Sequence, residues 1–207
     1  MSNFSVEQVK NVEPASKFEY CVAKKIADSL IETLEPFCEK IHVAGSIRRQ
    51  KPLVKDIEIV CEPQRVFFQT ELFGNGEHLV IPKFRNAVKL VSEYVIRGGI
   101  DGRYAQIRLK AGITLDMFLP QPHDYFRQLA TRTGSGDYSR FIIAAAWLKN
   151  GWCGTADGLR KTSECTKEGN KWKCYRNNPE LPPVWQSEEE FFGWIGAKYV
   201  EPAERNV

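Results

Sequence analysis

Two carboxylates, Asp56 and Glu58, stand one residue apart in the segment DIEIV, where their neighbours are apolar. Side chains alternate between the two faces of a β-strand, so a strand here would place both carboxylates on one face and Ile57 and Ile59 on the other. Adjacent carboxylates repel each other unless a cation lies between them, and hard oxygen ligands suit Mg²⁺. The pair therefore predicts a divalent-metal site on one face of a strand.

A Gly45-Ser46 turn precedes this acidic pair and is followed by Arg48 and Arg49. A turn that leads into a helix presents free backbone N–H groups, which favour an anion, and the two arginines add positive charge beside it. A phosphate cradle next to a divalent-metal site is the minimum equipment for phosphoryl transfer. Taken alone, the arginine pair would be interpreted as part of a solvated surface.

Asp116 is the third candidate, because it lies inside the apolar run ITLDMFLP. A carboxylate in such a strand has two interpretations. It is either a structural side chain that is paired locally, or a third metal ligand that strand pairing brings beside Asp56 and Glu58. The residues alone leave both open.

The elements that would position these side chains can be read from the pattern of apolar residues. Short apolar runs at 41–44 and 57–60 predict strands on either side of the turn. Recurrence every three or four residues predicts a helix from Ser16, with a capping box of Ser16 and Glu19, and a second helix over 83–96. Residues 65–68 are apolar enough to pack.

The second half of the chain opens with a hairpin signal. Two alternating runs, 104–109 and 113–119, are separated by Lys110-Ala111-Gly112. Prolines at 120 and 122 indicate a subdomain boundary near 120–130, and a helix is predicted over 137–149. A strand over 171–176 and a last helix that begins at a second capping box, Ser187 with Glu190, complete the pattern.

Composition excludes several classes of protein. The chain of 207 residues is 43% apolar and 27% charged, with a net charge of +3, as in an ordinary globular protein. No apolar run approaches the roughly 20 residues that span a bilayer, and the N-terminus lacks the apolar core of a signal peptide. We therefore expect an intracellular protein without a membrane partner. The six cysteines form no Cys-x-x-Cys pair, and reduced thiols are favoured over a metal at Cys153, Cys165 and Cys174.

The motifs together resemble those of family X DNA polymerases, the DNA polymerase β-like nucleotidyltransferases. About 190 residues take part, and the matching residues occur in the family's order: Gly45-Ser46, Arg48-Arg49, Asp56-x-Glu58, Asp116, Thr133-Gly134-Ser135 and the ending Lys198-Tyr199-x-Glu201-Pro202. The resemblance implies an α+β fold with a mixed palm sheet. Residues 1–125 would form the palm and 126–207 a small thumb. It also implies a reduced form without the lyase and fingers region, since only 40 residues precede the first palm strand.

The resemblance also implies a role for each matching residue. Asp56, Glu58 and Asp116 would be the catalytic carboxylates and would hold two Mg²⁺ ions, which Mn²⁺ could replace. Gly45, Ser46 and Arg49 would bind the triphosphate. The sugar and base pocket would be formed by Arg132, Thr133, Gly134, Ser135, Asp137, Ser139 and Arg140.

Four positions depart from the family pattern. Glu58 stands where the polymerases carry an aspartate, so its longer arm shifts the metal position. Val54-Lys55 replaces Ser-Gly, and Ala15 falls where an arginine would contact the phosphates. Thr131-Arg132 replaces an aromatic pair that presses the chain against the sugar. The first three are expected to weaken contacts with the triphosphate, and the last predicts weaker rejection of ribonucleotides.

We therefore expect a Mg²⁺-dependent DNA polymerase that transfers nucleotides from dNTP to the 3′-hydroxyl of primer-template or gapped DNA, in distributive gap filling or repair. The protein would act as a monomer. A template-independent or non-DNA nucleotidyltransferase is the alternative among enzymes. A non-catalytic palm that only binds DNA is the alternative outside them.

Overall fold

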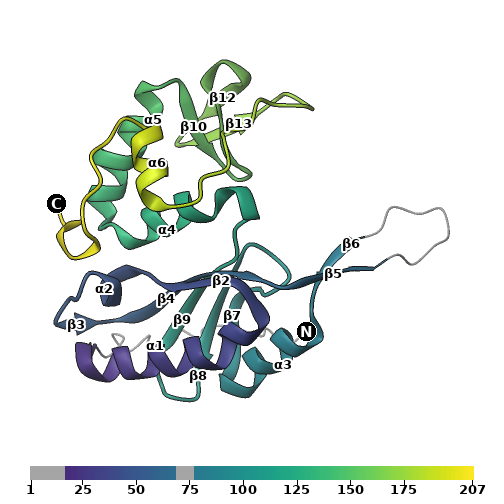
Figure 1. The fold of residues 1–207 in the computed structure, drawn as a ribbon, viewed down its shortest axis with the longest axis vertical. Helices are drawn as coiled ribbons and strands as arrows, with labels where there is room; N and C mark the ends of the chain where they lie inside the picture. Colours follow the sequence, from purple (N-terminus) through teal and green to yellow (C-terminus); the bar gives the residue numbers. More distant parts are fainter. Residues whose placement is uncertain (1–16, 69–76) are drawn as a thin grey trace, which may run out of the picture.

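The computed structural model describes residues 17–68 and 77–207. The fold is α+β with mixed sheets, which confirms the fold class expected from the sequence. Figure 1 shows two lobes, one holding the larger sheet with helices α1 and α3, and the other holding helices α4, α5 and α6 with a smaller sheet. A two-stranded arm, β5 and β6, projects from the first lobe. No helix within the described ranges is long and apolar enough to cross a membrane.

The larger sheet has five strands in the order β2-β4-β9-β8-β7, and only the β4–β9 pair among its neighbours is parallel. Its strands are β2 (Cys38–Val43), β4 (Asp56–Pro63), β7 (Ser92–Gly99), β8 (Tyr104–Leu109) and β9 (Thr114–Phe118). The β8–β9 hairpin confirms the predicted one, and Gly112 in its turn adopts a left-handed φ of 81°.

Helices α1 (Tyr20–Leu34) and α3 (Pro82–Val91) cover one face of this sheet (Figure 1). The alternation of β4 explains why: Ile57 and Ile59 are fully buried in the core beneath the helices, whereas Asp56 and Glu58 are only partly buried. Strand β8 alternates in the same way, with Ala105, Ile107 and Leu109 buried. The sheet face opposite the helices is therefore the one that carries the acidic side chains.

Two helix predictions need correction. Helix α1 begins at Tyr20, while residues 18–19 form strand β1 (Phe18–Glu19), which pairs with β3 (Leu53–Val54); Ser16 lies outside the described residues. Glu19 takes the N-cap position without a side-chain hydrogen bond. Helix α3 ends at Val91, and the predicted helical residues 92–96 form part of β7 instead, because pairing with β8 overrides their helical spacing.

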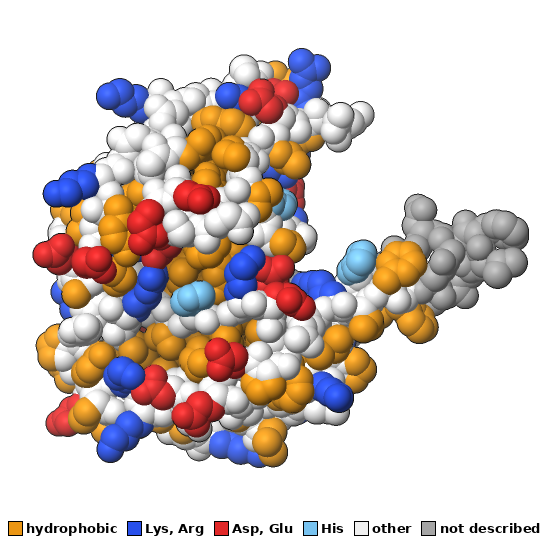
Figure 2. Space-filling view, viewed as in Figure 1, with side chains coloured by type: hydrophobic (Ala, Val, Ile, Leu, Met, Phe, Trp, Pro, Cys, Tyr) orange, Lys and Arg blue, Asp and Glu red, His pale blue; other side chains and the backbone are white. Residues whose placement is uncertain are grey.

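Residues 65–68, although apolar enough to pack, do not join the core. They form β5 (Arg65–Phe68), which pairs only with β6 (Glu77–Val80) in the arm. Val66, Phe67 and Phe68 are 48%, 59% and 54% exposed. Figure 2 shows hydrophobic side chains along this arm.

The second lobe is built around aromatic side chains. Its helices are α4 (Tyr125–Thr133), the π-helical η3 (Tyr138–Ala144), α5 (Ala145–Lys149) and α6 (Glu188–Trp194). Its sheet has the order β11-β10-β13-β12, formed by β10 (Trp152–Thr155), β11 (Gly158–Lys161), β12 (Cys165–Glu168) and β13 (Lys171–Cys174). The capping prediction at Ser187 is confirmed, because its Oγ accepts from Glu190 N at 3.2 Å. The buried aromatic residues are Tyr138, Trp147, Trp152, Trp185, Phe191 and Phe192.

A small hydrophobic cluster joins α4 to the larger sheet. Tyr125 and Leu129 of α4 pack against Ala44, Val60 and Phe118. The hydroxyl of Tyr125 also donates to the carbonyl of Val60 at 3.0 Å. The two lobes therefore meet at α4, close to residue 125, and the division of the chain into domains 1–125 and 126–207 stays a prediction.

Candidate active site

The three predicted carboxylates lie on two neighbouring strands. Glu58 of β4 is the direct pairing partner of Asp116 of β9. Asp56 lies two residues before Glu58, on the same face, and is paired with Thr114. Both strands run parallel, so all three side chains emerge from the sheet face opposite α1 and α3. The strand pairing thus brings Asp116 beside the Asp56-Glu58 pair.

The side chain of Glu58 turns toward the Gly45-Ser46 turn. Gly45 is buried and has a φ of 61°, and a methyl group added to it would lie only 1.8 Å from Glu58 Oε2. Burial and the charge of Asp56 raise the pKa of Glu58 to about 7. Burial, followed by the charge of Asp116, raises the pKa of Asp56 as well. The acidic group is therefore one in which negative charge is already costly.

Asp116 is held by local hydrogen bonds. Its Oδ1 accepts from the hydroxyl of Tyr104 at 2.6 Å and from Nε2 of Gln106 at 2.9 Å. Arg97 donates in turn to the Tyr104 hydroxyl at 3.1 Å. Tyr104, Gln106 and Arg97 were not among the predicted site residues, although the period of two in residues 104–109 could have placed Tyr104 and Gln106 on the acidic face.

The three carboxylates are oxygen ligands of the kind that a divalent cation prefers, and they lie on two neighbouring strands. Across residues 17–68 and 77–207, however, no group of three or more His, Cys, Asp or Glu side chains is arranged so that it could hold a metal ion. The contact between Glu58 and Gly45 supplies a reason, because the longer arm of the glutamate carries its carboxylate to the turn. The donors are thus of the type that Mg²⁺ prefers, but in this arrangement the described side chains do not form a metal-holding group.

The arginines after the turn are not a solvated surface. Helix α2 (Gly45–Arg48) is a single turn, and Arg48 donates from NH1 to Thr133 Oγ1 at 2.7 Å. Arg49 donates from NH1 to the carbonyl of Thr133 at 2.5 Å. Both arginines therefore reach the end of α4, where the predicted sugar pocket begins.

Three buried polar atoms around this turn lack a hydrogen-bond partner within the described part of the chain. They are Ser46 Oγ, Arg49 Nε and Arg132 Nε. An unsatisfied buried donor costs roughly 1–3 kcal/mol, so each is expected to serve a ligand or water. A hydroxyl and two guanidinium N–H groups are the kind of donors that a phosphate or another anion accepts.

Two cavities meet at Glu58 and Arg132. One of about 290 Å³ is lined by Arg49, Glu58, Thr131, Arg132, Gly134, Gly136 and Ser139. It joins predicted triphosphate and sugar residues in one space. The other, of about 560 Å³, is lined by Glu58, Asp116 and Arg132 together with Arg97, Gly98, Arg103, Tyr104, Phe118, Gln128 and Ala156. The guanidinium of Arg132 lies 4.0 Å from the centroid of the Phe118 ring, between the two spaces.

The other predicted pocket residues are partly engaged elsewhere. Thr133 is fully buried, Ser135 Oγ accepts from Tyr138 N at 3.1 Å, and Ser139 donates to the carbonyl of Thr131 at 2.7 Å. Asp137 and Arg140 are exposed. Asp137 lines neither cavity, and Arg140 lines a separate groove of about 450 Å³ with Phe141, Lys167 and Trp172.

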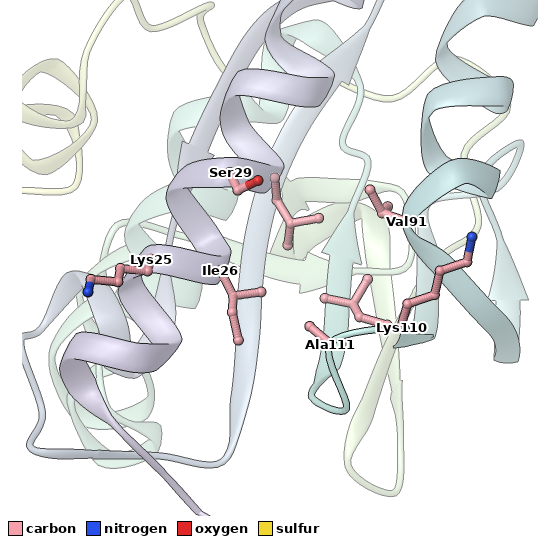
Figure 3. Close-up of a pocket in the computed structure, with 8 residues that line it drawn as sticks. Lys25, Ile26, Ser29, Val91, Lys110 and Ala111 are labelled. Carbon is pink, nitrogen blue, oxygen red and sulfur yellow. The ribbon is translucent and has the colours of Figure 1, made fainter.

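A further hollow of about 370 Å³ lies between α1 and the β8–β9 turn. Figure 3 shows Ile26, Val91 and Ala111 around it, with Lys25 on α1 and Lys110 on the turn. Its lining is apolar apart from the two lysines and Ser29, and it contains no carboxylate. It lies on the helix-covered side of the sheet and does not join the acidic site.

A scan of the chain against protein-family models and a search of curated proteins both gave no match. The functional assignment therefore rests on the residues and on their geometry.

Proposed function

We propose that this protein is a Mg²⁺-dependent nucleotidyltransferase of the family X DNA polymerase type, which adds nucleotides from dNTP to a primer 3′-hydroxyl. One observation carries the proposal: the parallel pairing of β4 with β9 sets Asp56, Glu58 and Asp116 on one face of the sheet. An acidic cluster next to unsatisfied anion donors is what phosphoryl transfer requires. The sequence motifs supply the resemblance, and this strand pairing brings two of them, Asp56-x-Glu58 and Asp116, together.

Each group has a task in that reaction. Asp56, Glu58 and Asp116 would hold the magnesium, which supplies positive charge for the triphosphate and lowers the pKa of the attacking hydroxyl. Tyr104 and Gln106 fix one oxygen of Asp116, so the other is oriented without reorganisation. The side chains that we assign to the phosphates are Ser46 and Arg49.

The nucleotide would occupy the cavity of about 290 Å³, because it reaches from Arg49 and Glu58 to Gly134 and Ser139. The second cavity, which shares Glu58 and Arg132 with it, is the space left for the primer end. Arg132 stands between the two. Since Arg132 offers donors where the family carries an aromatic ring, a 2′-hydroxyl could be accepted there rather than excluded.

DNA would be held mainly by the second lobe. Exposed cations lie on η3 and on the β12–β13 hairpin with the residues after it: Arg140, Lys167, Lys171, Lys173 and Arg176. Phosphate contacts from such side chains are sequence-independent and weaken as salt rises, by about one power of the salt concentration per contact. We expect weak, salt-sensitive binding and therefore distributive synthesis.

A non-catalytic DNA-binding protein is the second candidate. The packing of Glu58 against Gly45, with no metal-holding group formed in the described residues, favours it. A third candidate, a template-independent or non-DNA nucleotidyltransferase, would use the same acidic cluster on another acceptor.

Extension of a labelled primer on single-nucleotide-gapped DNA separates these candidates. Each reaction is run with Mg²⁺ or with chelator, and with or without the templating strand. We expect Mg²⁺-dependent addition of the complementary dNTP only when the template is present. Addition without template would favour the third candidate. Binding of the gapped DNA with no addition under any metal condition would overturn the polymerase proposal and favour the binding protein.

A further inference from the structure

Three of the six cysteines gather in the sheet of the second lobe, far from the carboxylates in sequence. Cys153 lies on β10, Cys165 begins β12, and Cys174 ends β13. Cys153 is fully buried and Cys165 is 9% exposed, whereas Cys174 is partly open to solvent. In the antiparallel β12–β13 hairpin, Cys165 and Cys174 are direct pairing partners.

The hydrogen bonds of this hairpin show which kind of pair the two cysteines form. Tyr175 N donates to the carbonyl of Glu164 at 3.1 Å, so the neighbouring pair, Glu164 with Tyr175, occupies a hydrogen-bonded position. Such positions alternate along an antiparallel ladder with non-hydrogen-bonded ones, in which the Cα atoms approach to about 4.5 Å and the side chains are closest. Cys165 and Cys174 therefore stand at a non-hydrogen-bonded position, with both side chains on one face.

That spacing suits a covalent link. Disulfides in proteins join residues whose Cα atoms are about 4.4–6.8 Å apart, so Cys165 and Cys174 need no change of backbone register. Cys153 is the competitor, because it also contacts Cys165, but β10 meets β13 in parallel at Thr155 and Trp172 and does not pair with β12. No strand register aligns Cys153 with Cys165.

We propose that Cys165 and Cys174 are a site of disulfide formation, closed by exchange with a small-molecule disulfide. The more exposed Cys174 gives up its proton and its sulfur attacks the small disulfide, which releases one thiol and leaves a mixed disulfide. Cys165 then loses its proton and attacks Sγ of Cys174, which releases the second thiol. Two protein thiols are oxidised, one external disulfide is reduced to two thiols, and both protons end on those thiols.

The two thiols differ in their exposure to solvent and in how readily each can act as the nucleophile. Burial, together with the neighbouring Cys153, raises the pKa of the Cys165 thiol to about 12. Cys165 is thus a poor first nucleophile and acts through its fixed position opposite Cys174. The next non-hydrogen-bonded pair on the same face is Lys167 with Trp172, which lines the groove beside Arg140 and Phe141. A disulfide between Cys165 and Cys174 would restrain the hairpin that forms that wall of the groove.

The test uses the full chain. The purified, reduced protein is incubated with oxidised glutathione, the remaining thiols are alkylated, and the tryptic peptides are mapped by mass spectrometry. We expect peptide 162–167 to be linked to peptide 174–176 and to lose that link on reduction. A link between 150–160 and 162–167 would join Cys153 to Cys165 instead and would overturn the proposal. So would glutathione retained on Cys174 with Cys165 still alkylated.

A matched variant tests the register itself. The double substitution Cys174→Ser/Tyr175→Cys moves the thiol by one residue and so to the opposite face of the strand, with almost the same loop length. We expect the link to Cys165 to be lost in this variant and to be retained in Cys153→Ser. An equal yield of the link in the shifted variant would show that loop closure, rather than strand pairing, brings the thiols together. Neither readout depends on the proposed polymerase activity.

Discussion

Glu58 stands where the resemblance to family X DNA polymerases implies an aspartate. Its extra methylene carries the carboxylate to Gly45, where burial and Asp56 raise its pKa to about 7. An aspartate at this position would fall short of the turn and stay nearer to Asp116. A protonated or metal-bound Glu58 is compatible with this environment, whereas a bare carboxylate is costly.

Metal-free protein should therefore become less stable as the pH rises through this region. The unfolded pKa is near 4.5 and the folded pKa about 7, so between them the folded state holds the extra proton and the free energy of unfolding falls with pH. A shift of this size corresponds to roughly 3–4 kcal/mol at most. In chelator, Glu58→Gln should gain stability relative to wild type between about pH 5 and about pH 8.

Urea unfolding at the two pH values measures this difference, and Glu62→Gln, the same substitution in the same strand, is the control. Equal pH dependence of wild type and Glu58→Gln would show that Glu58 does not titrate as the structure indicates.

Alternation along single strands made the acidic face predictable from the sequence. Asp56 and Glu58 had to share a face, and Asp116 was recognised because a carboxylate is out of place in an apolar run. Alternation could also place Tyr104 and Gln106 on the acidic face, but it could not show that they contact Asp116. Tyr104 and Gln106 reach it only because β8 and β9 pair in one register, which depends on the whole hairpin.

The turn between β2 and α2 is the element that ties the acidic strand to the anion donors. Gly45 is required there twice over, by its left-handed φ of 61° and by the contact with Glu58. Gly112 in the β8–β9 turn has a similar φ of 81° but open space around it. Substitutions at these two glycines therefore distinguish the cost of backbone strain alone from the added cost of a close contact with Glu58.

Gly45→Ala should destabilise the protein more than Gly112→Ala. Both variants incur left-handed strain of about 1–2 kcal/mol, and only Gly45→Ala must also displace the Glu58 carboxylate. We expect an additional loss of about 1–3 kcal/mol in Gly45→Ala, measured by urea unfolding. If the two variants lose equal stability, Glu58 does not rest against the turn in solution.

Elements with a long, regular apolar repeat were easier to predict than short strands. The apolar spacing of residues 83–91 continues into 92–96, so no local signal marks Ser92 as the point where the helix ends and an edge strand begins. Residues 65–68 are apolar, yet they pair only with β6 and remain exposed. Neither outcome is local, because both depend on which strand is available as a partner.

The two lobes are joined by a buried ion cluster as well as by α4. Glu188 at the start of α6 accepts from Arg48 of α2 at 2.5 Å and from Arg205 at 2.6 Å, and Arg205 is fully buried. Burial alone would raise the pKa of Glu188, but its hydrogen bonds to Arg48 and Arg205 outweigh burial and lower that pKa. Arg48 therefore links the turn to the second lobe.

Glu188→Gln should destabilise the whole protein by about 3–5 kcal/mol, since it leaves two arginines without their buried counter-ion. Glu189→Gln, an exposed position on the same turn of α6, should change stability by less than about 0.5 kcal/mol. The loss should also shrink at low pH, because a depressed pKa contributes stability that disappears as Glu188 protonates. Urea unfolding of both variants decides this, and equal effects would contradict a role for the cluster in joining the lobes.

The most direct measurement is single-nucleotide incorporation into gapped DNA with Mg²⁺ by wild type and Asp116→Asn. Asparagine keeps the shape of the side chain and its bonds to Tyr104 and Gln106 are retained in part, so folding should be preserved. The control is Asp28→Asn, an exposed aspartate on α1 paired with Lys24. We predict that Asp116→Asn lowers the incorporation rate by about a thousandfold or more at an unchanged melting temperature, while Asp28→Asn has no effect. Incorporation by Asp116→Asn at the wild-type rate would contradict the assignment of this acidic face as the catalytic centre.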